Sequence, residues 1–261
     1  MIDIGSVRLG VWIAALWWPF LRALSLLSTA PVFSSPDVPK RLRIGLAIFL
    51  AVVIQPLLPN MAASARNSWA LFLMLSLQQV LVGVILGFAV RIAFAAVNFA
   101  GAVIGLEMGL GFATLFDPQN GVKVPTLSSF LALFGVLIFL AMNGHLILIV
   151  AFAKSFGVAP VGLTWHYGAD TWYALVRWGG QLFLLGLAMA LPVLTLLVAA
   201  NLALGVLAKV APQLNIFVVG FPVLLLLGLA GLYLAAPLMG QAMLSALQGG
   251  LRVTGLLVGA R

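Results

Sequence analysis

Long apolar runs, separated by short polar or proline-rich stretches, dominate the pattern of the chain. The longer runs cover residues 9–27, 69–100, 127–152, 178–207 and 216–236, and a shorter run covers residues 44–58. A helix of about 20 apolar residues crosses a membrane, so the first run is adequate for a span and the second is long enough to span and continue. The pattern predicts a single all-α membrane domain of helical hairpins, several of them broken by Pro or Gly.

Composition excludes a water-soluble protein. Hydrophobic residues make up 64% of the 261 residues, charged residues only 7%, and the mean hydropathy is +1.23. The surface of a soluble domain with this balance would be one continuous apolar patch. The formal charge of +8 comes from 13 basic residues that are scattered among the loops, which is typical of topology signals, so we expect no nucleic-acid partner. Because there is no cysteine, disulfides and thiol catalysis are excluded.

The connection after the first run carries the strongest topology signal. Residues 28–43 contain three prolines and are predicted to be non-helical, and Lys40, Arg41 and Arg43 form the densest basic cluster of the chain. By the positive-inside rule this connection is cytoplasmic, which places the N-terminus outside. The first 30 residues show no small-residue cleavage site, so we expect residues 9–30 to be a retained span.

Residues 101–125, which read GAVIGLEMGLGFATLFDPQNGVKVP, differ from the long runs. They begin as an apolar helix, loosen at Gly109 and Gly111, break at Asp117-Pro118 and turn through Asn120-Gly121. Non-helical backbone at membrane depth persists only against protein or a water-filled cavity. The stretch therefore indicates an internal passage.

Three charged side chains lie inside the apolar runs. Arg22 has two open interpretations: it snorkels toward the end of its helix, or it takes part in a buried pairing. Glu107 also has two: it pairs with Arg91, or it faces a water-filled cavity below the loop. We do not expect a catalytic or proton-relay role for Glu107.

Other polar positions favour packing over chemistry. Asn143 and His145 interrupt the run at 127–152, and His145 has no second ligand at metal spacing, so we interpret both as a hydrogen-bonded helix interruption or an interface. Gly83 and Gly87 are four residues apart, which close helix packing and flexibility explain equally well. A polar joint between the last two runs is predicted from Asn201, Lys209, Gln213 and Asn215.

Four stretches in register resemble the FliR family, the export-gate subunits of flagellar type III secretion. They are WPFLRALSLLSTAP with VPKRLRIGLA (residues 18–47), GLEMGLGFATLFDPQNG (105–121), FLAMNGHLILIV (139–150) and NLALGVLAKVAPQLNIFVVGFP (201–222). The homologous subunit of virulence injectisomes is a near alternative, and the DP and NGHL stretches favour the flagellar branch.

The resemblance implies a non-enzymatic subunit without a cofactor. It implies assembly with FliP and FliQ around a closed central pore for unfolded flagellar proteins, and FlhB and FlhA as further partners, in the bacterial inner membrane at the flagellar basal body. It also implies a FliP-like part over residues 1–175 and a FliQ-like part over residues 176–261. Family complexes rise partly out of the bilayer, so not every apolar run need be a conventional span.

The resemblance also implies a plug loop that closes the pore. The matching residues are Gly109, Leu110, Gly111, Phe112, Ala113, Thr114, Leu115, Phe116, Asp117 and Pro118. An apolar constriction holds back ions by dewetting, and glycine supplies the backbone freedom that movement needs. A packed apolar helix end is the simpler alternative for these residues.

Two other functional classes fit the chain less well. A small-molecule or ion transporter calls for repeated halves and a coupling carboxylate near the midplane, and the chain shows no internal repeat and only Glu107 as a candidate. An intramembrane enzyme requires a nucleophile–base pair or a metal cluster, which the sequence does not provide.

Overall fold

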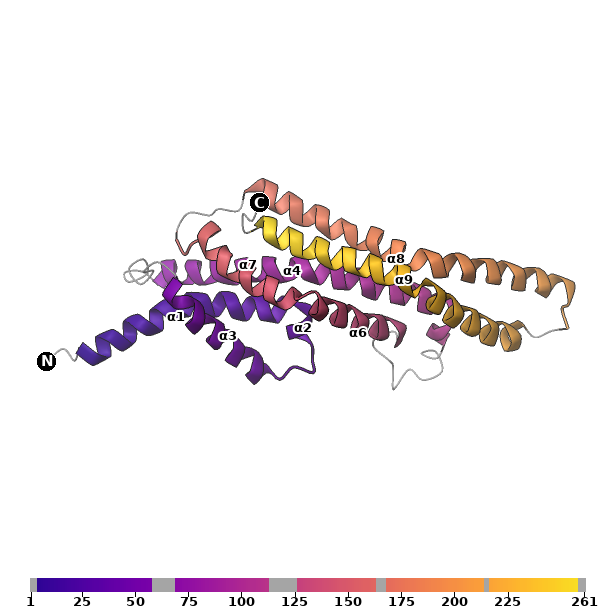
Figure 1. The fold of residues 1–261 in the computed structure, drawn as a ribbon, viewed down its shortest axis with the longest axis horizontal. Coiled ribbons are helices and arrows are strands. Elements are labelled where there is room, and N and C mark those ends of the chain that lie inside the picture. Colours follow the sequence, from indigo (N-terminus) through magenta and orange to yellow (C-terminus); the bar gives the residue numbers. More distant parts are fainter. Residues whose placement is uncertain (1–3, 58–68, 113–125, 163–167, 214–215, 258–261) are drawn as a thin grey trace. The chain divides into compact units, whose positions relative to one another are not determined.

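The computed structural model describes residues 4–57, 69–112, 126–162, 168–213 and 216–257, and the regular structure of these residues is helical (Figure 1). The all-α fold predicted from the apolar runs is confirmed. The helices form two compact units that are each discontinuous in sequence. Unit 1 consists of residues 1–91, 143–178 and 250–261, and unit 2 consists of residues 92–142 and 179–249.

Unit 1 is built around a hairpin of α1 (Ile4–Thr29) and α3 (Lys40–Ile54), joined through the short helix α2 (Pro31–Ser34). The 3₁₀ turn η1 (Gln55–Leu57) follows α3. The prediction that residues 28–43 are non-helical is wrong in part. Pro31 occupies the first turn of α2, where a missing N–H costs nothing, and α3 begins directly after Pro39.

Four further helical segments complete unit 1. They are the first part of α4 (Trp69–Glu107), all of α7 (Gly144–Val158), the start of α8 (Ala169–Val210) and the end of α9 (Ile216–Leu257).

Two glycines bring α1 and α4 close together within unit 1. A Cβ atom on Gly83 would clash with the Ser25 hydroxyl and the Arg22 carbonyl oxygen, and one on Gly87 would lie 2.8 Å from Cβ of Thr29. Both contacts are too close for a real side chain. Of the two explanations that the spacing left open, the structure therefore supports close packing.

Unit 2 contains the rest of α4, the 3₁₀ turn η2 (Leu110–Phe112), α6 (Thr126–Ala141) and most of α8 and α9. α4 and α6 meet at Gly101, where an added Cβ would lie 2.6 Å from Cα of Ser128. The Ser128 hydroxyl donates a hydrogen bond to the Asn98 carbonyl at 2.8 Å. α8 and α9 form an antiparallel hairpin, visible in Figure 1, in which Gly231 packs against Leu196.

Proline breaks fewer helices than the sequence pattern predicts. Pro19, Pro192, Pro222 and Pro237 all lie inside helices. α8 begins at Ala169, well before Trp178, and α9 continues through Pro237 to Leu257. The last helix therefore extends beyond the apolar run at 216–236, because surrounding helices can compensate for the one hydrogen bond that an internal proline removes.

Within the described residues, three helices are long and apolar enough to cross a membrane: Trp69–Glu107, Ala169–Val210 and Val218–Leu257. The number rises to four if α6 and α7, which meet at an angle of 65°, form one broken span. α3 has only 15 residues, or about 22 Å of helix, which is short of a membrane crossing.

Candidate functional site

The candidate site is the end of α4 and the residues that follow it in unit 2. Of the predicted plug residues, Gly109 to Phe112 have a described backbone, while residues 113–118 lie outside the described residues. α4 ends at Glu107, Gly109 turns the chain, and η2 continues it. The predicted loosening of the helix at Gly109 is therefore present in the backbone.

Gly109 has φ = 77°, in the left-handed region that side chains with a Cβ adopt at a cost. Gly111 lies in η2, and its φ is not in the positive, left-handed region. A Cβ on Gly111 would lie 3.3 Å from Cδ2 of Leu106, which a small side-chain shift can accommodate. The backbone freedom of glycine is therefore used at Gly109, whereas Gly111 adopts a conformation that other residues share.

The residue before the turn is tightly packed. The side chain of Met108 is 1% exposed. A Cβ on Gly228 of α9 would lie 2.7 Å from both Sδ and Cε of Met108, so Met108 fills the space that a larger residue at 228 would occupy. Shape complementarity at this contact fixes the end of α4 against α9.

Glu107 is held by α8. Its Oε2 accepts a hydrogen bond from Nδ2 of Asn201 at 3.1 Å. Arg91 lies sixteen residues earlier on the same continuous helix, about 24 Å away by helical rise, and its side chain is exposed. The structure thus brings Glu107 to Asn201 and does not bring it to Arg91.

Asn201 belongs to the predicted polar joint, whose other members are placed separately. Lys209 is exposed in the last turn of α8, and Gln213 is exposed in the turn that follows. Asn215 lies outside the described residues. The described part of this prediction yields one polar contact, between Asn201 and Glu107.

The second predicted polar position separates α6 from α7. Asn143 has φ = 56° and precedes α7, and the two helices bend by 65° there. Asparagine tolerates the left-handed region better than most residues, which explains its place at the break. His145 follows in the first turn of α7, and its buried Nδ1 has no hydrogen-bond partner among the described residues. The helix break predicted at 143–145 is present, whereas the hydrogen-bonded or interface role of Asn143 and His145 stays a prediction.

Sequence reasoning left Arg22 open, and the structure places it in a buried cluster of unit 1. Its side chain is 0% exposed. Nε donates to Oε1 of Gln79 at 2.9 Å, and Nη2 donates to the same oxygen. Nη1 donates to the Ser155 hydroxyl at 2.9 Å, and Nη2 also donates to the Ala159 carbonyl at 2.7 Å.

An aromatic ring completes this cluster. The guanidinium carbon of Arg22 lies 3.8 Å from the ring centroid of Phe156, which is a cation–π distance. The cluster therefore joins α1, α4 and α7. Gln79 was recognisable in the sequence only as a polar interruption of an apolar run.

The described residues provide no set of side chains that could bind a metal ion. Among the residues that the structure describes, no group of three or more His, Asp or Glu side chains is placed to hold a metal ion. The candidate site instead provides a glycine turn directly after Glu107 and Met108, which both contact neighbouring helices at the end of α4.

Comparison with known proteins places this arrangement in a family. Residues 13–250 match the bacterial export proteins, family 1. The chain is 42% identical over 241 residues to the flagellar biosynthetic protein FliR of Pectobacterium carotovorum, covering 91% of this chain and 90% of that protein. It is 42% identical to FliR of Escherichia coli K12 with the same coverage, and 32% identical to FliR of Bacillus subtilis over 78% of each chain.

Proposed function

Because the chain belongs to family 1 of the bacterial export proteins, we propose that it is a non-enzymatic subunit of the flagellar type III protein export gate. In this proposal it forms, with FliP and FliQ, the pore that passes unfolded flagellar proteins through the bacterial inner membrane at the basal body. The observation that carries the proposal is the 42% identity over nine-tenths of both chains to proteins named FliR.

Exposed apolar surface supports assembly with other membrane subunits. In unit 2, large apolar side chains on the α8–α9 hairpin are strongly exposed, among them Leu202, Leu226 and Tyr233 at 68%, 66% and 81%. Such faces require lipid or protein cover. We assign FliP and FliQ to part of this cover, and include FlhB and FlhA as further partners in the proposal.

The division into a FliP-like part (1–175) and a FliQ-like part (176–261) belongs to the same proposal. The α8–α9 hairpin supports it, since this hairpin is continuous helix on both sides of a short turn and begins at Ala169, close to the proposed boundary. The remaining helices precede it in the sequence.

Residues 109–118 serve, in this proposal, as an apolar plug that helps to keep the pore closed. A constriction lined by Phe112, Leu115 and Phe116 would exclude ions, because a narrow apolar passage loses its water. The left-handed Gly109 and the packed Met108 support it, because α4 is followed by an enclosed side chain and the chain turns at the next residue.

Two measurements test the proposal in the intact complex. Co-purification of the tagged chain with FliP and FliQ from the host membrane tests the assembly; recovery of the chain without them contradicts it. Deletion of residues 110–116 tests the plug: we expect an assembled complex with raised ion conductance in planar bilayers. An assembled deletion complex with unchanged conductance rejects the plug and leaves the assembly intact.

A further inference from the structure

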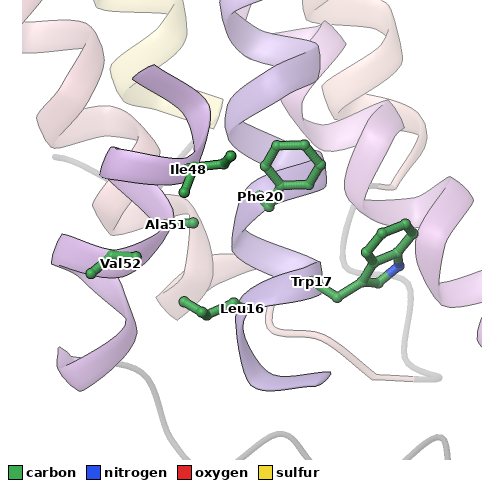
Figure 2. A pocket seen from close by; sticks show the side chains of 6 residues that line it. All are labelled: Leu16, Trp17, Phe20, Ile48, Ala51 and Val52. Atoms are coloured by element: carbon green, nitrogen blue, oxygen red, sulfur yellow. The ribbon is translucent and has the colours of Figure 1, made fainter. Parts of the chain in front are cut away.

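An apolar groove lies between α1 and α3 in unit 1, in a different unit from the candidate site. It has a cavity volume of about 260 Å³ and is lined by Leu16, Trp17, Phe20, Ile48, Ala51 and Val52. Figure 2 shows Ile48 beside Phe20 at one end, and Leu16 and Val52 toward the other. The groove is thus a furrow between two antiparallel helices with apolar side chains on both walls.

One stripe of α3 connects this groove to the basic start of the helix. Arg41, Gly45, Ile48 and Val52 are spaced by four, three and four residues, so they lie on one helical face. A Cβ on Gly45 would meet no heavy atom within 4 Å. Space is therefore open at Gly45, which lies on this stripe between Arg41 and the groove.

The start of α3 favours an anionic group. Lys40 and Arg41 are exposed, the first turn contains no acidic residue, and Pro39 supplies no side-chain cap to the free backbone N–H groups. Arg43 is partly engaged, since its Nε donates to the Phe33 carbonyl at 3.0 Å. Asp37 is the carboxylate nearest in sequence, and it accepts a hydrogen bond from Ser35 at 2.9 Å. Two net positive charges remain at this end.

We propose that this surface binds an anionic phospholipid. The phosphate lies against Lys40, Arg41 and the first-turn amides, and one acyl chain follows the stripe past Gly45 into the groove. The helical rise from Arg41 to Val52 is about 16 Å, which matches half of a hydrocarbon core of about 30 Å. A polar end, an apolar furrow and a one-leaflet length together fit a lipid.

The test uses the full complex in nanodiscs and a phosphatidylglycerol that carries a diazirine in mid-chain. Trypsin cleaves after Arg8, Arg22, Arg43 and Arg66, so the two walls of the groove fall on peptides 9–22 and 44–66. We expect light-induced adducts on both peptides, competed by unlabelled phosphatidylglycerol and poorly by phosphatidylcholine. Free glycerol phosphate should not compete, because the acyl chain contributes the groove contact.

Matched variants separate charge from shape. Replacing Lys40 and Arg41 by Gln should lower adduct yield by about fivefold per cation, whereas Arg177→Gln, an exposed cation on α8, should leave it unchanged. Gly45→Leu should block the path and abolish the adducts, and Gly45→Ala should retain most of them. Co-elution of each variant with the complex checks its fold.

Three results would overturn the proposal. The first is equal competition by phosphatidylcholine, and the second is adduct yield that does not depend on Lys40 and Arg41. The third comes from the Val52→Cys variant, which introduces the only thiol of this cysteine-free chain: efficient cross-linking of this thiol to another protein in the native membrane would show that protein covers the groove.

Discussion

Removing the guanidinium of Arg22 should destabilise unit 1 strongly. Arg22→Met keeps most of the apolar stem but leaves Oε1 of Gln79 and the Ala159 carbonyl without their donors. The Ser155 hydroxyl loses less, because it also donates to the Phe152 carbonyl at 2.6 Å. Each buried acceptor without a donor costs about 1–3 kcal/mol, and the lost contact with Phe156 adds about 1–2 kcal/mol.

One effect works in the opposite direction: the wild type pays the cost of removing the charged Arg22 side chain from water, and the Met variant does not. Full replacement of a buried charged cluster by apolar residues is often neutral, whereas removal of one partner typically costs about 3–5 kcal/mol, because the others stay buried and unpaired. Arg22→Met is a one-partner removal, so the loss should dominate. We expect a net destabilisation of about 3–5 kcal/mol.

Thermal unfolding of the purified complex in detergent measures this loss. Arg22→Met should lower Tm by on the order of 10 °C, whereas Arg252→Met, which alters an exposed arginine of α9 in the same unit, should change it little. Adding Gln79→Leu to Arg22→Met should recover part of the loss, since both partners are then apolar. An Arg22→Met protein as stable as the wild type would refute the reasoning.

Three smaller predictions concern glycine and asparagine positions. Gly83→Val should separate α1 from α4 and cost more than 2 kcal/mol, as overpacked positions do; a wild-type Tm would contradict the close crossing. Asn143→Gly should leave the stability nearly unchanged, whereas Asn143→Val should lower it by about 1–2 kcal/mol because a β-branched residue disfavours the left-handed φ at this position. The change in Tm measures both effects. Gly109→Val should slow export of flagellar proteins more than Gly111→Val, since only Gly109 has positive φ; equal secretion rates would count against this.

The helical membrane fold and the break at Asn143 were predictable because both depend on local sequence. An apolar run determines a helix, and an Asn-Gly pair inside one interrupts it. Proline was misleading for the opposite reason. Pro237 lies inside α9, and the residues on both sides of it are apolar and helical. Packing of these residues against other helices keeps the helix continuous despite the proline.

The polar contacts were not predictable, because their partners are remote in sequence. Arg22 meets Gln79 and Ser155, which are 57 and 133 residues away, and Asn201 meets Glu107 across 94 residues. A single sequence identifies such side chains as costly to bury but does not identify the partner. The nearest opposite charge to Glu107 in its own helix was Arg91, and the geometry of a continuous helix keeps the two apart.

The anchoring of α4 restricts where movement of the proposed plug can begin. Met108 is enclosed against Gly228, and Glu107 is tied to Asn201, so displacing the helix end breaks contacts with both α9 and α8. Gly109, directly after these anchors, is the first residue whose backbone conformation does not depend on a packed side chain. Rotation at Gly109 therefore leaves both anchors intact. In the proposed gate, the anchored end of α4 is the fixed part, and the residues from Gly109 onward are the part that moves.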